Sequence, residues 1–75
     1  GTSPIRNVRG IGDEGFAQDG SSTLFSTATS TVWLRIDTLT VEVQVLTNET
    51  RVTPQLRNAA LRAARTVAAE LAETA

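Results

Sequence analysis

Residues 31–47 read TVWLRIDTLTVEVQVLT, and this stretch decides the fold. In its first half Val32, Leu34 and Ile36 alternate with other residue types, and in its second half every odd position from Leu39 to Val45 is apolar. Successive side chains of a strand point to opposite faces, so each half predicts a β-strand with one face in a core. The many β-branched residues favour the same structure.

Asp37 and Thr38 form the predicted turn between these two strands. A two-residue loop would set Ile36 opposite Leu39 and place the apolar pairs of both strands on one face, which supports this register. Such loops normally carry Asn-Gly or Asp-Gly, and a threonine is poorly suited to the second position. A longer, four-residue turn is therefore the alternative.

Residues 1–22 are rich in turn-forming residues and predict a loop-rich N-terminal segment with one helical turn near residues 13–18. We expect four apolar side chains to anchor it to the rest of the chain, namely Ile5, Val8, Ile11 and Phe16. Residues 10–15, GIGDEG, match the dinucleotide-binding pattern GxGxxG. Since no strand precedes them, no long helix follows and two carboxylates would meet the pyrophosphate, turn glycines are the better interpretation.

Three carboxylates of this segment, Asp13, Glu14 and Asp19, raise the question of a calcium site. Their spacing does not follow an EF-hand loop, and we expect a solvated acidic loop. Residues 23–29 then predict a third strand, with Leu24 and Phe25 as its apolar side chains and a break near residue 30.

A long helix is predicted for residues 54–74, with Thr53 as N-cap and Pro54 at the first helical position. Its expected apolar stripe consists of Leu56, Ala60, Ala63, Val67 and Leu71, widened by Leu61, Ala64 and Ala68. We expect the helix to dock through its larger members, Leu56, Val67 and Leu71. The predicted fold is α+β, a three-stranded antiparallel meander with one C-terminal helix packed on one face, in a single domain over residues 23–75.

The composition of the 75-residue chain argues against catalysis. It has no cysteine, histidine, lysine or tyrosine, so the commonest thiolate and imidazole metal ligands and the usual general bases are missing. The sequence predicts no enzyme, no catalytic residue, no cofactor and no metal site. Seven basic and eight acidic residues give no broad attraction to nucleic acid, and the apolar runs are too short to span a bilayer.

One candidate contact surface lies on the strand face that points away from the predicted core. Trp33, the only tryptophan, shares this face with Arg35, and Glu42 is expected directly across from Trp33. An aromatic side chain covering a small sheet, beside an Arg35–Glu42 pair, is one interpretation. A protein or ligand contact is the other, because tryptophan and arginine are enriched in interface hot spots.

A second candidate surface lies on the predicted helix. Arg62 and Arg65 occupy its first half and Glu70 and Glu73 its last turns, which opposes the helix dipole. Two such helices could run antiparallel with arginine opposite glutamate. Because so small a chain without disulfide or metal needs burial from elsewhere, we expect a homodimer.

The order of these segments resembles a known family. Residues 8–17, VRGIGDEGFA, resemble the "GLGDEAF" turn of actinobacterial secreted lipoproteins and of the extracellular sensor domains of some receptor kinases. Residues 32–43 resemble the hairpin "VxRxGNxxVxV" that follows it there, and an alanine-rich helix comes next. The chain departs at Gly15, where the family usually has alanine, and at residues 37–38, where it has Gly-Asn.

The resemblance covers residues 8–71 and corresponds to the C-terminal half of such a domain. It therefore implies, as an alternative to the homodimer, a missing N-terminal half of a larger domain. It implies a non-enzymatic, extracytoplasmic module, secreted or attached to the cell surface, that binds a small molecule or a protein. The alternative is a structural module that acts through homo-oligomerisation. A concave pocket lined by Trp33 would favour ligand binding, and a flat surface occupied by a second copy would favour assembly.

Overall fold

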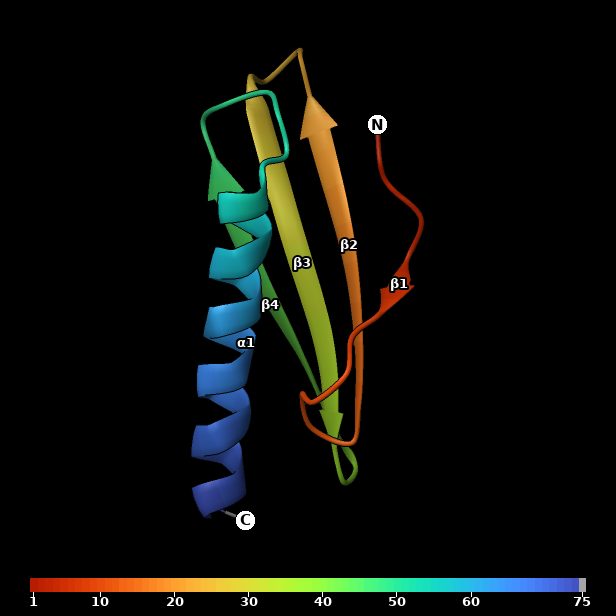
Figure 1. Ribbon diagram of the computed structural model, residues 1–75, viewed down its shortest axis with the longest axis vertical. Coiled ribbons are helices and arrows are strands. Elements are labelled where there is room, and N and C mark those ends of the chain that lie inside the picture. Colours follow the sequence, from red (N-terminus) through yellow and green to blue (C-terminus); the bar gives the residue numbers. More distant parts are fainter. Residues whose placement is uncertain (75) are drawn as a thin grey trace.

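The computed structural model describes residues 1–74 as one antiparallel sheet and one helix (Figure 1). The strands are β1 (Arg6–Asn7), β2 (Glu14–Ser22), β3 (Thr27–Ile36) and β4 (Leu39–Thr47), and they lie side by side in chain order. The helix α1 (Pro54–Thr74) packs on one face, over β3 and β4. The predicted α+β class, with an antiparallel sheet and one C-terminal helix, is confirmed.

The expectation of three strands is wrong, because the described sheet has four. Residues 14–22, expected within a loop with a helical turn, form β2, and β1 pairs with its middle. The alternation of β2 is inverted relative to an ordinary amphipathic strand. Its buried positions are the small or polar residues Gly15, Ala17 and Asp19, while Phe16 points to the other face and is 39% exposed.

The strand expected over residues 23–29 is also corrected. Residues 23–26 form a turn in which Ser26 has a φ of 51°, and β3 runs from Thr27 to Ile36 without a break at Ser30. Leu24 and Phe25 are therefore exposed at the turn instead of packing in a strand.

The β3–β4 hairpin has the predicted two-residue loop and register. Ile36 pairs with Leu39, and further along the strands Leu34 pairs with Val41. Of the two loop residues only Asp37 has a positive φ, 56°, so the threonine at the second position carries no left-handed strain. The backbone N–H of Asp37 donates a hydrogen bond to Asp13 Oδ2 at 2.7 Å, which helps to fix the turn.

The helix begins as predicted, with Thr53 Oγ1 accepting a hydrogen bond from the Leu56 N–H at 3.2 Å. Its buried stripe is centred on Leu56, Ala60 and Ala64. Val67 and Leu71, expected to dock the helix, are only half-buried. The alanines lie at the centre because their short side chains let α1 approach β3 closely.

The β1–β2 loop closes the core beside α1. Ile11 is 1% exposed and packs with Ala17, Val32 and Leu34, while Val8 is partly buried against the same cluster. The other two expected anchors, Ile5 and Phe16, are exposed. The loop can lie this close because Gly15 has no Cβ. A Cβ there would lie 2.9 Å from the Val8 carbonyl oxygen, which explains the small residues inside β2.

Candidate functional site

The face of the sheet opposite α1, here called the outer face, carries the candidate contact surface. The strand registers align its side chains in rows across β2, β3 and β4. The central row contains Phe16, Trp33 and Glu42. The two neighbouring rows consist of Glu14, Arg35 and Thr40 on one side, and Gln18, Thr31 and Gln44 on the other.

Trp33 is held in place by its strand neighbour. Its indole Nε1–H donates a hydrogen bond to Glu42 Oε1 at 2.9 Å, directly across the β3–β4 ladder. The ring is half-buried, so part of its surface reaches solvent. Because the polar end of the indole is satisfied within the chain, the accessible part of Trp33 offers mainly apolar contact area.

Trp33, Arg35 and Glu42 share one face as predicted, but the expected Arg35–Glu42 pair is wrong. Arg35 instead lies opposite Glu14, and its Nε is 3.4 Å from Glu14 Oε2. Its Nη1 is 3.8 Å from Asp13 Oδ2. Directly opposed side chains lie closer than diagonal ones, which explains why Arg35 pairs with β2 and leaves Glu42 to the indole. Such exposed pairs contribute less than about 1 kcal/mol each.

Phe16 is the member of this surface that sequence reasoning missed. It lies directly opposite Trp33 in the β2–β3 register, and the two rings form the apolar centre of the outer face. The only sign of its position in the sequence is that a large aromatic side chain stands between two small residues, Gly15 and Ala17. That signal identifies a face only when residues 14–22 are recognised as a strand.

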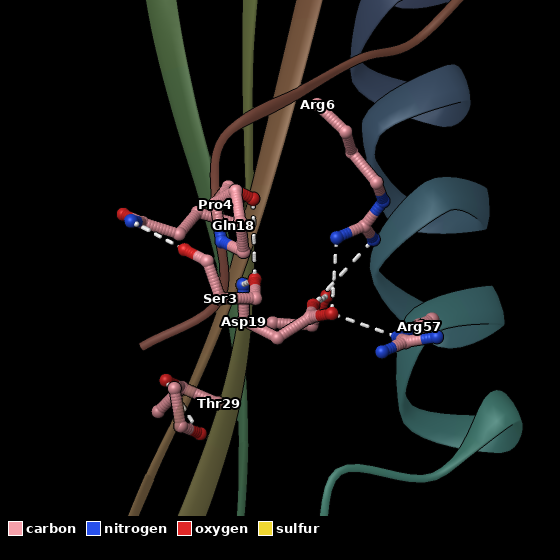
Figure 2. A network of polar contacts seen from close by, with 9 residues as sticks. Ser3, Pro4, Arg6, Gln18, Asp19, Thr29 and Arg57 are labelled. Carbon is pink, nitrogen blue, oxygen red and sulfur yellow. Dashed lines mark hydrogen bonds and ion pairs between the residues drawn. The ribbon is translucent and has the colours of Figure 1, made fainter. Parts of the chain in front are cut away.

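A second cluster lies on the helix side of the sheet, around Asp19 (Figure 2). The Asp19 carboxylate is 2% exposed and accepts hydrogen bonds from Ser30 Oγ at 2.7 Å, Arg57 Nε at 2.7 Å and Arg6 Nη1 at 3.0 Å. Figure 2 shows Arg6 and Arg57 reaching toward it from different elements. The expectation of a solvated acidic loop is therefore wrong for Asp19, while Asp13 and Glu14 are exposed.

The charge state of Asp19 follows from these contacts. Burial alone raises the pKa of its carboxyl group, but the hydrogen bonds from Ser30, Arg6 and Arg57 outweigh burial, and the net pKa is lowered. A carboxylate occupied by three donors is a poor general base and has no room to approach a substrate. Its position between β1, β2, β3 and α1 instead indicates a structural role.

The helix candidates Arg62, Arg65, Glu70 and Glu73 are all exposed. Within the part of the chain that the structure describes, their side chains form no ion pair with one another. Arg65 lies between two open grooves on the flank of α1 that faces β2. One is lined by polar and charged helix residues with Leu61, and the other by the β1–β2 loop, Ile36 and helix alanines. Trp33 lines neither groove.

Among the described residues, no group of three or more acidic, histidine or cysteine side chains is placed to hold a metal ion. The described helix is not long and apolar enough to cross a membrane. Comparisons of the chain with protein-family models, with curated proteins and with solved structures find no match.

Proposed function

We propose that this chain is a non-enzymatic binding module that contacts a partner protein through the outer face. The observation that carries the proposal is the position of Trp33, fixed by Glu42 and lying beside Phe16 on the sheet face that α1 leaves open. An apolar aromatic centre within a polar and charged rim is the usual anatomy of a protein interface.

The shape of the outer face favours a macromolecule over a small molecule. Small-molecule sites are concave and enclose most of the ligand surface. Trp33 instead lies on an open sheet face, with the exposed side chains of Glu14, Thr40 and Gln44 around it. A partner protein can cover such a face and exclude water from both aromatic rings.

An extracytoplasmic location is part of the same proposal. Its support is the resemblance of residues 8–17, residues 32–43 and the alanine-rich helix to secreted lipoproteins and sensor domains of actinobacteria. We expect the coding sequence upstream of this segment to encode a lipoprotein or secretion signal. A coding sequence without any export signal would count against this location.

The alternative function is assembly through homo-oligomerisation. The observation that favours it is separate from Trp33: strand β4 forms an edge of the sheet, and its valines on the helix side are only half-buried. A module that acted only through self-association would need no ligand at the outer face.

Substitution of Trp33 tests the proposed interface. A partner is captured from envelope extracts, identified and purified, and its affinity for the chain is measured by titration calorimetry. Trp33→Ala should weaken binding by about 30-fold or more, the loss of about 2 kcal/mol that is typical of a central hot spot. Leu46→Ala is the matched control, because Leu46 is exposed on the same face but two rows away.

The control variant should bind within about twofold of the unmodified chain, and circular dichroism should show that both variants are folded. Unchanged affinity of a folded Trp33→Ala variant would overturn the proposal. Equal losses from Trp33→Ala and Leu46→Ala would also contradict it, because they would indicate a diffuse contact without an aromatic centre.

A further inference from the structure

Strand β4 presents an open edge of nine residues, Leu39–Thr47. In an antiparallel ladder, alternate residues direct their main-chain N–H and C=O groups toward opposite neighbours. The two-residue hairpin makes Ile36–Leu39 the hydrogen-bonded closing pair, so the odd-numbered residues of β4 bond to β3. The main-chain groups of the even-numbered residues, Thr40, Glu42, Gln44 and Leu46, therefore point away from the sheet.

This edge lacks the devices that normally prevent pairing with another chain. The β3–β4 register is continuous, so β4 contains no bulge, and its sequence has neither proline nor lysine. Its single charged residue is Glu42, and that carboxylate already accepts the Trp33 indole hydrogen bond. The edge is thus a template for another strand.

An incompletely covered apolar strip runs beside the edge. Val41, Val43 and Val45 point to the helix side of the sheet but are only half-buried. On α1, Ala63 and Val67 are half-buried as well. Successive helix residues are rotated by about 100°, so Ala63 and Val67 lie on the other side of the buried stripe from Arg57. Because Arg57 reaches toward Asp19 on β2, Ala63 and Val67 face β4. The strip therefore joins the strand edge and the near flank of the helix.

We propose that β4 pairs antiparallel with β4 of a second copy, about a two-fold axis that passes through Val43. The two four-stranded sheets would then form one sheet of eight strands. In this register Val41 lies opposite Val45 of the partner subunit, and Glu42 lies opposite Gln44 of the partner subunit. All nine residues of each strand are paired, and the valine strips of both copies become continuous.

The neighbouring registers fit less well. Centring the axis on Glu42 would set the two Glu42 carboxylates directly opposite each other, which is destabilising in a cross-strand pair. Centring it on Gln44 would leave Leu39 and Thr40 without partners inside β4. If the register slipped by one residue, each odd-numbered residue of one strand would pair with an even-numbered residue of the other. The valine face of one strand would then lie on the same side of the sheet as the polar face of the other.

The two-fold axis places the two helices antiparallel on the same side of the joined sheet. Arg65 lies on the flank of α1 that faces β2, so it points away from the helix of the partner subunit. The pairing therefore rests on the strand edge and the apolar strip, which a second copy of the chain satisfies together.

Single cysteines test the register, because the chain has no cysteine of its own. Val43 lies on the proposed axis as a non-hydrogen-bonded pair, in which opposed side chains come closest and a disulfide can close. Val43→Cys, oxidised with copper phenanthroline at micromolar concentration, should yield mostly disulfide dimer on a non-reducing gel. Val45→Cys alone should yield less than about a tenth as much, whereas a mixture of Val41→Cys and Val45→Cys should form the mixed dimer.

Equal yields from Val43→Cys and Val45→Cys would show random collision and overturn the register. No dimer from a folded Val43→Cys variant would do the same. Neither variant changes the outer face, so failure of this test leaves the proposed Trp33 interface standing, and failure of the Trp33 test leaves this one standing.

Light scattering on a sizing column tests the association itself. The unmodified chain should elute at twice its mass of 8.0 kDa, and a folded 8.0 kDa species at about 100 μM would overturn the proposal. Gln44→Pro removes an outward N–H without removing a bond to β3, so it should give a folded monomer. Gln44→Val is the control, because it also loses the side-chain bond to Thr31 but keeps the N–H and should remain dimeric.

Discussion

At the scale of single residues, Gly12 shows how a missing Cβ positions part of the molecule. Its φ is 60°, and a Cβ there would lie 2.5 Å from the backbone oxygen of Arg35. The same oxygen accepts a hydrogen bond from the Asp13 N–H at 2.7 Å. The close approach therefore places the β1–β2 loop against β3, brings Ile11 into the core and sets Asp13 beside Arg35.

Alanine substitutions at two neighbouring glycines separate crowding from backbone strain. Gly10 also has a positive φ, 79°, but nothing lies within 4 Å of its Cβ position. Gly10→Ala should cost only the strain of a left-handed alanine, about 1–2 kcal/mol. Gly12→Ala should cost about 1–3 kcal/mol more, because the Arg35 backbone must move as well. Urea unfolding measures both, and equal losses would mean that the loop relaxes freely away from β3.

Individual side chains were predictable from the sequence where strand alternation alone places them. Trp33, Arg35 and Glu42 share a face because they lie on strands with a clear period of two. The partner of Arg35 was not predictable in this way, since Glu14 contacts it only through the pairing of β2 with β3. Asp19 was misplaced for the same reason: nothing local distinguishes a buried aspartate with distant arginine partners from one in a solvated loop.

At the scale of elements, the sequence predicted those with a strong local signal. The hairpin β3–β4 follows from alternating β-branched residues, and α1 follows from Thr53, Pro54 and a long run of helix formers. Strand β2 has no such signal, because its inner face carries Gly15, Ala17 and Asp19. Those residues are small or charged since a loop and two arginines cover them, and such tertiary contacts cannot be read from β2 itself.

Docking of α1 is testable at its best-buried leucine. Leu56 is 6% exposed, and Leu56→Ala should lower the free energy of unfolding by about 2–4 kcal/mol. Leu71 is half-buried on the same helix, so Leu71→Ala should cost clearly less. Chemical denaturation of both variants gives the comparison. A larger loss at Leu71 would place the main contact of the helix near its C-terminal end instead.

At the scale of the whole molecule, the two proposed surfaces are compatible. A two-fold axis perpendicular to the sheet keeps both outer faces on the same side of the joined sheet. Each dimer would thus present two Trp33–Phe16 centres in one direction, and a partner with repeated sites could engage both. Simultaneous engagement increases apparent affinity without any new contact, provided that the spacing of the sites matches.

The Asp19 cluster connects the elements of this small molecule. Arg6 comes from β1, Asp19 from β2, Ser30 from β3 and Arg57 from α1. The ion pair with Asp19 also explains why Arg57, a basic residue, lies in the first turn of α1, where the helix dipole disfavours a positive charge. No other polar cluster in the described residues reaches as many elements, so the protonation of one carboxylate should affect the whole fold.

Stability in acid tests this connection. Because the folded-state pKa of Asp19 lies below the unfolded value of about 3.9, its contribution is fully present above that pH and is lost as the pH falls through the folded value. Urea unfolding should show the free energy falling below about pH 4. Asp19→Asn should lower stability at pH 7 and flatten the acid loss, because Arg6 and Arg57 then lack their carboxylate at every pH. Glu14→Gln, at an exposed pair, should leave the acid slope nearly unchanged. Parallel acid profiles for the unmodified chain and Asp19→Asn would show that other carboxylates govern the loss of structure.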